Sequence, residues 1–377
     1  MGNLQFPEKY TIVKGYKIRY LDYDHNDKKR GKNKANRSNH FNRTLVILHG
    51  IGPSSERWEP VIPTFSKYFR VIVPDIVGFG KSEKPVDTYY RMRFFVDFLQ
   101  AFLEKLHIER CVLIGHSFGG YLATEFAIEH REIVVKLILV APAGPGRNSN
   151  HILDQYIGAA LYPTYQRARK AFMDMAFDPK TVIDDTVNNF VEQMSSPNAK
   201  YAFMQTLHGI KNGPELKGRL SRIICPTLVI WGKNDKMISA DYANEYHEIL
   251  NKKIEIIENC GHTPFVENPD KFIEIVITFL RKEHHKLHLH QCNICNVIFE
   301  CNCISIDHRP KQHQEKEGKI IKKEKSKVEK RAVHNKFRVD MCRTCEKNQY
   351  LKKEQEGLFE AMEDPLKWRL KHWWLWW

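Results

Sequence analysis

Short apolar runs alternate with longer amphipathic stretches along most of the chain, and this alternation predicts β-strands separated by helices. The runs that predict buried strands lie at residues 45–48, 71–75, 111–114, 135–140, 222–231 and 253–257. The stretches that predict helices lie at residues 58–69, 89–106, 240–250 and 270–281. Strands that alternate with helices are typical of a mostly parallel sheet covered on both faces, so an α/β fold is expected.

Two segments depart from this alternation. Residues 10–22 alternate apolar and polar side chains around Gly15, which predicts a β-hairpin. Residues 147–220 contain no strand-like run and predict helices at residues 152–161, 166–177, 183–194 and 201–210. Because this segment is rich in aromatic residues and methionine, we expect a helical cap over a largely apolar pocket.

A serine lies at the apex of a glycine-flanked turn between a predicted strand and a predicted helix. The sequence Gly-His-Ser-Phe-Gly at residues 115–119 follows the apolar run 110–114 and precedes the amphipathic stretch 120–127. The glycines permit a strained turn in which a side chain two residues before or after Ser117 would collide with the neighbouring strand or helix. A turn of this kind exposes a nucleophilic hydroxyl at the mouth of a sheet, with a helix N-terminus behind it.

An acid and a histidine follow this serine in the order of a catalytic triad. Asp235 follows the apolar run 228–231, and His262 lies in a Gly-His turn after the run 254–257. The order serine, acid, histidine differs from the orders found in the two best-known serine protease folds. Asp241 falls in the next predicted helix, so Asp235 is the preferred acid.

Together these segments resemble the α/β-hydrolase superfamily from about residue 10 to residue 279. The matching segments lie at residues 49–53, 75–82, 115–120, 231–235 and 261–267. The resemblance implies an α/β-hydrolase fold, with a mostly parallel central sheet, helices on both faces and a helical cap. It also implies an enzyme that needs no cofactor for catalysis.

The resemblance assigns a role to each candidate catalytic residue. Ser117 would be the nucleophile, His262 the general base and Asp235 the acid that orients the histidine. The backbone N–H groups of Ile51 and Phe118 would form the oxyanion hole that stabilises the tetrahedral intermediate.

The same resemblance narrows the reaction to a hydrolysis. Residues 50–55 and 75–82 are similar to hydrolases that cleave vinylogous diketones from aromatic-ring degradation, which usually carry tryptophan after the catalytic histidine. Thr263 stands at that position here, and this difference favours a carboxylic ester hydrolase that acts on a small ester with an apolar acyl group through an acyl-enzyme intermediate. Carbon–carbon bond hydrolysis of a ring-cleavage diketone is the alternative. The serine disfavours haloalkane dehalogenase and epoxide hydrolase activities, because relatives with those activities use aspartate there.

The net charge of +14 is concentrated outside the predicted catalytic core. Residues 26–43 carry seven lysines and arginines against one acid, and residues 284–377 carry twenty against thirteen acids. Only one of the net positive charges falls elsewhere, so the charge of the chain gives no reason to expect an anionic substrate.

The hydrophobic pattern and the composition together divide the chain into a catalytic core, a cap and a C-terminal extension. Residues 1–146 form the first part of the hydrolase core, with a basic surface loop at 25–43, and residues 221–283 form the second part. Residues 147–220 form the cap, and residues 284–377 form a basic, Cys/His-rich extension. No run of about twenty apolar residues occurs, and the first residues lack the apolar stretch of a secretory signal, so we expect a cytoplasmic protein.

The C-terminal extension carries two Cys-x-x-Cys pairs, Cys292 with Cys295 and Cys342 with Cys345. Two such pairs are the ligand set of a structural zinc site, although their separation exceeds that of a zinc ribbon. Cys301, Cys303, His288 and His290 are alternative ligands. Reduced thiols without a metal are the other alternative in a cytoplasmic protein.

The extension also suggests partners other than a substrate. The tryptophan cluster within residues 368–377 is typical of a weak contact with a membrane interface. A hydrolase-fold scaffold whose basic tail binds nucleic acid or another protein is the non-enzymatic alternative. The complete triad favours the enzyme, because a scaffold has no physical need for all three groups. The sequence does not predict an oligomeric state.

Overall fold

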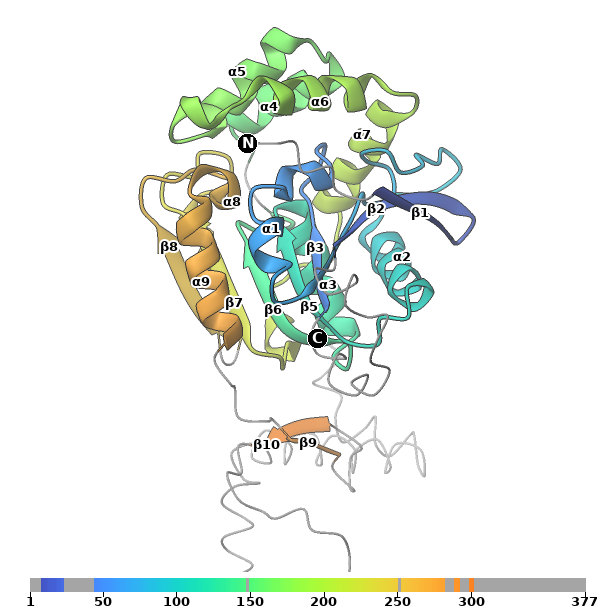
Figure 1. The fold of residues 1–377 in the computed structure, drawn as a ribbon, viewed down its shortest axis with the longest axis vertical. Coiled ribbons are helices and arrows are strands. Elements are labelled where there is room, and N and C mark those ends of the chain that lie inside the picture. The colour runs from blue at the N-terminus through green and yellow to red at the C-terminus, as the bar shows by residue number, and fades with distance from the viewer. Residues whose placement is uncertain are drawn as a thin grey trace, which may run out of the picture. The chain divides into compact units, whose positions relative to one another are not determined.

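The computed structural model describes residues 8–23, 44–146, 149–249, 252–281, 288–291 and 298–301, and its central feature is an eight-stranded sheet (Figure 1). The strands are β1 (Glu8–Val13), β2 (Tyr16–Tyr23), β3 (Thr44–Leu48), β4 (Arg70–Pro74), β5 (Cys111–His116), β6 (Val134–Val140), β7 (Thr227–Gly232) and β8 (Lys252–Ile257). Their order across the sheet is β1-β2-β4-β3-β5-β6-β7-β8. All pairs from β4 to β8 are parallel, whereas β1–β2 and β2–β4 are antiparallel. This topology confirms the predicted α/β fold with a mostly parallel sheet.

Helices cover both faces of the sheet. In β3, Leu45 and Ile47 belong to one buried apolar cluster, while Val46 and Leu48 belong to the other. The first cluster includes side chains of α1 (Ile62–Phe65) and α9 (Pro269–Arg281), and the second includes side chains of α2 (Met92–Lys105) and α3 (Phe118–Glu129). Because both faces are buried, the parallel strands are continuous apolar runs, which is why the sequence pattern predicts them well.

The hairpin predicted over residues 10–22 is confirmed. Strands β1 and β2 pair in antiparallel register, with Val13 opposite Tyr16. The turn between them is Lys14-Gly15, and both residues have positive φ, 49° and 89°. Two consecutive positive φ angles are the condition for a tight turn that matches the twist of the strands, and glycine at the second position meets this condition without strain.

The single helix predicted at residues 58–69 is wrong. The structure has instead a 3-10 helix, η3 (Ser55–Trp58), and the one-turn helix α1. Pro60 and Pro63 explain the interruption, because proline has no N–H to donate within a helix and is tolerated only in the first turn. The helix predicted at residues 240–250 is present as a 3-10 helix, η6 (Ala240–Glu248).

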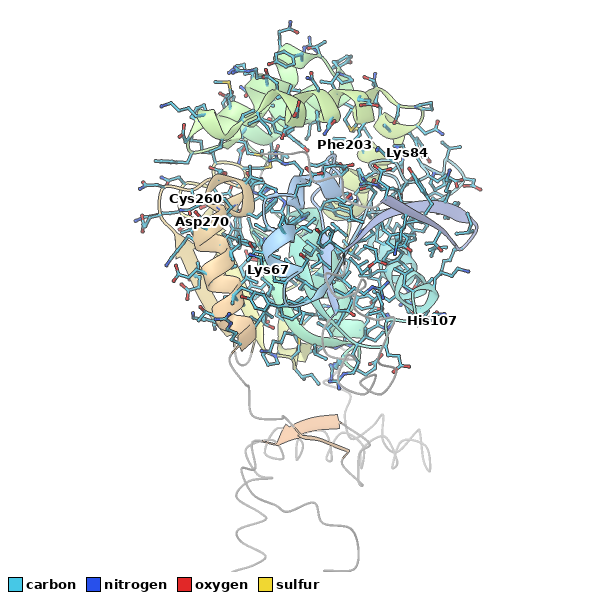
Figure 2. The ribbon with its side chains drawn as sticks, viewed as in Figure 1. Lys67, Lys84, His107, Phe203, Cys260 and Asp270 are labelled. Atoms are coloured by element: carbon cyan, nitrogen blue, oxygen red, sulfur yellow. The ribbon has the colours of Figure 1, made fainter. Side chains whose placement is uncertain are left out.

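Four helices lie in a layer beyond the end of the sheet that carries Ser117: α4 (His151–Leu161), α5 (Tyr165–Met175), α6 (Asp184–Ser195) and α7 (Ala199–Lys211) (Figure 1). Short 3-10 helices follow α5 and α7, namely η4 (Pro179–Thr181) and η5 (Leu220–Arg222). Phe203 of α7 and the loop at Lys84 lie where this layer meets the sheet (Figure 2). There Asn198 Nδ2 donates a hydrogen bond of 3.3 Å to the carbonyl of Lys84. All four helices begin and end within two residues of their predicted bounds.

A separate two-stranded sheet follows the last core helix in the chain, formed by β9 (His288–Gln291) and β10 (Ile298–Cys301). No helix within the described ranges is long and apolar enough to cross a membrane. The predicted basic loop at 25–43, the four candidate zinc ligands and the tryptophan cluster lie outside the described residues.

Candidate active site

Ser117 lies at a sharp turn between β5 and α3, with a φ of 52°. This left-handed region is one that non-glycine residues rarely adopt. The glycines beside the serine are required by close approach: a Cβ on Gly115 would lie 2.2 Å from the carbonyl oxygen of Gly119. A Cβ on Gly119 would lie 2.5 Å from the carbonyl oxygen of His49. The turn therefore has the geometry of a nucleophile elbow.

Asp235 and His262 are joined by a short hydrogen bond. Asp235 Oδ2 accepts from His262 Nδ1 at 2.7 Å and from Trp231 Nε1 at 3.1 Å. Asp235 Oδ1 accepts from the backbone N–H groups of Met237 and Ile238, each at 2.9 Å. These donors fix the carboxylate, and the carboxylate in turn holds the proton of the neutral imidazole on Nδ1, so Nε2 is the free acceptor.

The free nitrogen of His262 lies at the same pocket as Ser117. Nε2 is buried and has no hydrogen-bond partner in the described part of the chain. The structure does not contain the Ser117–His262 hydrogen bond expected of a tight triad, and triads without substrate are often looser in this way. Asp241, the alternative acid, bonds instead to Ser239 at the surface.

The two amides predicted to form the oxyanion hole are both unused. No hydrogen bond joins the N–H of Ile51 or of Phe118 to another described residue. Phe118 is the first residue of α3, and the first amides of a helix have no partner within the helix. The carbonyl of Ile51 accepts a hydrogen bond of 2.7 Å from the Tyr156 hydroxyl, so a cap helix holds the conformation of this segment.

Two further histidines near Ser117 are engaged in structural hydrogen bonds. His49 Nδ1 donates to the carbonyl of Gly50 at 2.7 Å, and its Nε2 accepts from the N–H of Ile76 at 2.9 Å. His116 Nε2 donates to the carbonyl of His262 at 2.9 Å. Burial lowers the pKa of His49, and burial together with the nearby His262 lowers the pKa of His116 well below its usual range. Both rings are therefore neutral, and their hydrogen bonds hold the loops of the site in place.

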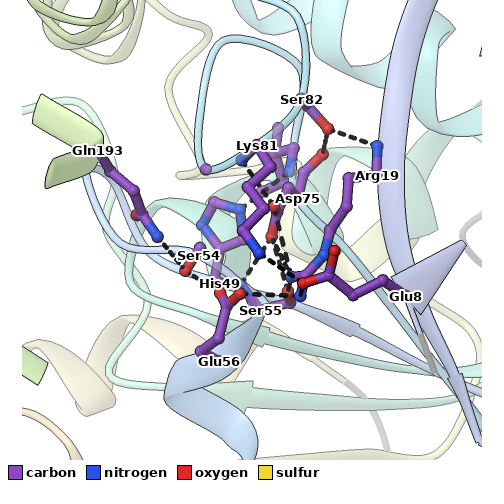
Figure 3. A network of polar contacts seen from close by, with 12 residues as sticks. Glu8, Arg19, His49, Ser54, Ser55, Glu56, Asp75, Lys81, Ser82 and Gln193 are labelled. Carbon is purple, nitrogen blue, oxygen red and sulfur yellow. Dashed lines mark hydrogen bonds and ion pairs between the residues drawn. The ribbon is translucent and has the colours of Figure 1, made fainter. Parts of the chain in front are cut away.

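A buried ion pair holds the segment that follows Ile51 (Figure 3). Arg19 Nη1 lies 3.3 Å from Asp75 Oδ1 and also donates to the Ser55 hydroxyl. Asp75 Oδ1 accepts from the N–H of Ser55 at 2.9 Å and from its hydroxyl at 2.7 Å. Asp75 Oδ2 accepts from the N–H of Lys81 at 2.8 Å. Asp75 therefore ties the loop after β4 to the start of η3.

The network extends outward from Arg19 in two directions. Its Nη2 atom lies 2.9 Å from Glu8 of β1 and 2.8 Å from Glu56 of η3. Gln193 of α6 donates to the Ser54 hydroxyl at 2.8 Å, and that hydroxyl also bonds Glu56 (Figure 3). The first strand and the cap therefore both support the segment next to Ile51, whose N–H is the predicted oxyanion-hole amide.

Glu267 organises the loop that carries His262. One of its oxygens accepts from the N–H groups of Gly261 and Phe177, each at 2.8 Å. The other accepts from the N–H and the hydroxyl of Thr263, at 3.0 and 3.2 Å. Glu267 belongs to the short helix α8 (Pro264–Glu267), while Phe177 follows α5, so this carboxylate joins the histidine loop to the cap.

The pocket at Ser117 is small and mostly apolar. About 30 Å³ of it is open to water, well below the size of an ordinary ligand site, so a substrate must displace side chains on entry. Its walls come from the sheet loops and from the cap: His49, Gly50, Ile51, Pro53, Arg57, Trp58, His116, Ser117, Tyr156, Phe172, Met175, Met237, His262, Thr263 and Phe265. Arg57 is the only cationic side chain in this set apart from the histidines.

Three contributors to the site were not assigned by sequence reasoning. Glu267 and Trp231 lie within segments that match the superfamily, but the match does not assign their bonds. Trp231 Nε1 donates to Asp235 Oδ2 and to the carbonyl of Ile238, and Glu267 accepts from the N–H of Phe177, which is ninety residues away. Arg57 lies one residue before the helix predicted at residues 58–69, and no motif near it marks it as a pocket residue. The Pro-interrupted segment after the oxyanion loop was the only signal that could have drawn attention to it.

No metal site accompanies these residues in the described ranges, where His, Cys, Asp and Glu form no group of three or more suited to an ion. Cys292, Cys295, Cys342 and Cys345, the predicted zinc ligands, lie outside those ranges.

Comparisons with known proteins place this chain in a family. The family model described as "Alpha/beta hydrolase family" matches residues 45–275, which is more than half of the chain. The chain therefore belongs to the alpha/beta hydrolase family, as its sheet and its elbow indicate.

Individual relatives indicate which members of this family the chain resembles. The chain is 31% identical over 254 residues to a 2-hydroxy-6-oxononadienedioate/2-hydroxy-6-oxononatrienedioate hydrolase of Burkholderia vietnamiensis, covering 64% of this chain and 88% of the relative. It is 29% identical over 245 residues to a 2-hydroxymuconate semialdehyde hydrolase of Pseudomonas sp. CF600, covering 63% and 86%. Among solved structures, a meta-cleavage product hydrolase of Pseudomonas fluorescens IP01 shares the fold, with a TM-score of 0.63 and 24% identity, covering 74% of this chain and 98% of the other.

Proposed function

We propose that this chain cleaves a carbon–carbon bond in a vinylogous diketone of the ring-cleavage type, with Ser117 as the nucleophile. The observation that carries the proposal is the similarity to hydrolases named for such substrates, which extends over 86% and 88% of the length of two of them. These relatives support the carbon–carbon reaction over the ester hydrolysis that Thr263 suggests.

Three groups carry the first step. As Ser117 Oγ attacks the keto carbonyl, His262 Nε2 takes the hydroxyl proton, and Asp235 stabilises the imidazolium that forms. The carbonyl oxygen becomes an oxyanion, to which the N–H groups of Ile51 and Phe118 donate. Loss of one such donor typically costs about 3 kcal/mol of transition-state stabilisation.

The second step breaks the carbon–carbon bond. The tetrahedral intermediate collapses, and the electron pair of that bond moves onto the leaving carbon, where the adjacent unsaturated carbonyl delocalises it. The imidazolium of His262 returns its proton to this fragment as the acyl group remains on Ser117. Water, deprotonated by His262, then attacks the acyl carbonyl and releases a carboxylic acid.

Ester hydrolysis is the second candidate, because the same groups perform it with an alkoxide as the leaving group. Thr263 is the feature that favours it, since the superfamily members that cleave diketones usually carry tryptophan there. Thr263 donates both its N–H and its hydroxyl to Glu267, so its place in this chain is explained by support of the His262 loop.

A direct competition between the two substrate classes tests the proposal. The coloured 2-hydroxy-6-oxo-6-phenylhexa-2,4-dienoate loses its absorbance when the carbon–carbon bond is cleaved, and 4-nitrophenyl butyrate reports ester hydrolysis. We expect kcat/KM for the dienoate to exceed that for the ester by at least about 100-fold, or about 2.7 kcal/mol. Ser117→Ala should abolish both reactions, whereas Ser149→Ala, an exposed serine beside Asp154, should abolish neither. Turnover of the ester without consumption of the dienoate would contradict the carbon–carbon reaction and leave the esterase.

A further inference from the structure

We propose that Glu267 is a positioning residue for His262, through which the placement of the cap sets the placement of the catalytic base. This inference rests on the proposed function only in taking His262 as the base of Ser117, and it applies equally to cleavage of a carbon–carbon bond and of an ester. Glu267 does not belong to the wall of the pocket at Ser117, so it acts on the reaction only through the histidine.

The carboxylate of Glu267 joins two segments of main chain that are far apart in the sequence. On one side it accepts from the N–H of Gly261 at 2.8 Å and from the N–H of Thr263 at 3.0 Å, the residues immediately before and after His262. On the other side it accepts from the N–H of Phe177 at 2.8 Å, in the turn that follows α5 of the cap. Because peptide groups on both sides of the histidine bond to this carboxylate, a displacement of the carboxylate displaces the base.

The junction at Gly261 is too tight for either segment to move alone. A Cβ on Gly261 would lie 2.7 Å from the carbonyl oxygen of Met175 and 2.9 Å from the nitrogen of Phe177. It would also lie 3.0 Å from Glu267 Oε1. The end of α5 therefore packs directly on the main chain of the histidine loop, and close-packed contacts of this kind transmit a shift.

The same cap segment forms part of the pocket wall. Met175, two residues before Phe177, lines the pocket at Ser117. This pocket is smaller than an ordinary ligand site, so a substrate displaces wall residues as it enters. A displacement of Met175 reaches Phe177 through the intervening main chain, and it reaches Glu267 through the hydrogen bond. Occupation of the pocket is thereby communicated to the base.

The base is held at only one of its two nitrogens in this structure. His262 Nδ1 lies 2.7 Å from Asp235, whereas Nε2 is buried and has no hydrogen-bond partner in the described part of the chain. A misplacement of about 1 Å in a reacting contact costs about 100-fold in rate. A modest movement relayed by Glu267 is therefore sufficient to complete or to break the contact between His262 and Ser117.

Removal of the carboxylate tests its role as a support of the base. We expect Glu267→Ala to lower kcat for 4-nitrophenyl butyrate about 10- to 100-fold per active site and to change KM less than about 3-fold, because the ground-state pocket is left intact. Glu267→Gln keeps one acceptor oxygen and should recover part of the loss. The matched control is Glu258→Gln, four residues before His262, whose exposed carboxylate pairs with Lys233; it should leave kcat and KM unchanged.

A pair of substitutions at residue 177 separates the link to the cap from support of the loop. Phe177→Pro removes the N–H that bonds Glu267 and leaves the donors of Gly261 and Thr263 in place. Ala176 has φ −75° and ψ 152°, the conformation that a residue before proline adopts. We expect kcat to fall about 10-fold, as for loss of one hydrogen bond to a charged group. Phe177→Ala, which loses a half-exposed ring but keeps the N–H, should behave as the wild type.

A proton resonance distinguishes displacement of the base from a loss of stability. The Nδ1–H proton between His262 and Asp235 gives a low-field ¹H signal whose position depends on the geometry of this hydrogen bond. Well below the Tm of each variant, we expect the signal to move in Glu267→Ala and in Phe177→Pro. It should stay in place in Glu258→Gln and in Phe177→Ala.

Three results would overturn the proposal: an unchanged kcat in Glu267→Ala, equal kcat in Phe177→Pro and Phe177→Ala, or a low-field signal that stays in place in both Glu267→Ala and Phe177→Pro. If Glu267→Ala does not fold, the two variants at residue 177 decide the matter. If the ester is turned over too slowly, the rate at which a fluorophosphonate labels Ser117 replaces kcat, because it depends on the same base. A chain that does not cleave the dienoate, yet shows these losses, contradicts the proposed function and leaves the role of Glu267 standing.

Discussion

Two arginines contact or belong to the short helix η3, yet their surroundings are opposite. Arg19 is 2% exposed and lies within 3.3 Å of three carboxylates, those of Asp75, Glu56 and Glu8. Arg57 lies at the catalytic pocket and has no carboxylate within 4 Å among the described residues. Carboxylates of the protein therefore pair with the first cation, and no described carboxylate pairs with the second.

The pKa values of the two side chains show the same difference. Burial alone lowers the pKa of a guanidinium, but the neighbouring carboxylates outweigh burial at Arg19 and raise its pKa. At Arg57 burial prevails and the pKa is lowered. A buried charge is costly unless it is paired, so Arg19 and Arg57 should contribute differently to the stability of the fold.

The largest effect we expect is the loss of catalysis at Ser117, in the pocket that Arg57 lines and Arg19 does not. Ser117→Ala should lower kcat about 10⁶-fold, because the nucleophile and its base act as one unit. The measurement is steady-state turnover together with covalent labelling by a fluorophosphonate, followed by mass spectrometry. Labelling that persists in Ser117→Ala would identify a different nucleophile and remove the basis of the comparison.

Breaking the paired arginine should be costly for folding. Arg19→Met leaves Asp75 buried without its cation, and we expect the free energy of unfolding to fall by about 3–5 kcal/mol in urea titrations. The matched control is Arg93→Met, which removes a surface arginine that pairs with Asp97 and Glu129. We expect it to change the free energy of unfolding by less than about 1 kcal/mol. Equal behaviour of the two variants would show that the buried network is not a support of the fold.

The buried side chain of His116 offers a second test of how burial affects a basic group that has no carboxylate partner. The folded pKa of His116 is lowered by burial, so below pH of about 6.5 the unfolded chain binds a proton that the native chain does not. Stability should be complete above that pH and fall as the pH decreases toward the folded pKa, by at most about 1.4 kcal/mol per pH unit for this residue. His116→Gln should reduce the slope between pH 7 and 5, whereas His107→Gln, at an exposed position, should preserve it. A slope unchanged in His116→Gln would assign the acid sensitivity to other groups.

The link between cap and oxyanion loop should have a smaller effect. Tyr156→Phe removes the hydrogen bond to the carbonyl of Ile51, and we expect a loss of about 1 kcal/mol in the free energy of unfolding. Tyr165→Phe, whose hydroxyl meets an exposed aspartate, serves as the control and should be silent. If Tyr156→Phe leaves both stability and kcat unchanged, the cap does not support the oxyanion segment through this contact.

The smallest change in stability is expected at the unpaired arginine. Arg57→Met gives up a long hydrogen bond and a contact with Phe172 but also removes an uncompensated cation, so the free energy of unfolding should change by less than about 1 kcal/mol. The measurement is the urea titration used for Arg19→Met. A loss as large as that of Arg19→Met would mean that Arg57 is a structural residue like its neighbour.

The sequence predicts the sheet, the elbow and the cap helices because their signals are local. Apolar runs and glycine spacing act through neighbours in the chain, so they survive without knowledge of the fold. The helix at residues 58–69 fails for an equally local reason that the periodicity conceals, namely Pro60 and Pro63.

The functional pocket is less predictable because its supports are distant in sequence. Glu267 acts through Gly261 and through Phe177, ninety residues away, and only the fold brings those amides together. Arg57 stands out because no described carboxylate pairs with it. A sequence does not show whether a charged side chain has a partner. The near neutrality of the core likewise averages over paired and unpaired charges.

The hairpin at the start of the described chain has a practical consequence for anyone who handles this protein. Glu8, in the first strand, bonds Arg19 at 2.9 Å and Lys81 at 2.5 Å, and Arg19 reaches the segment beside the oxyanion loop. Loss of residues 1–9, by proteolysis or by the choice of cloning boundary, therefore removes the Glu8 carboxylate that holds Arg19. Glu8 is more than a hundred residues before Ser117 in the sequence. A preparation that is folded but has low activity should first be checked by intact mass for the loss of its first residues, including Glu8.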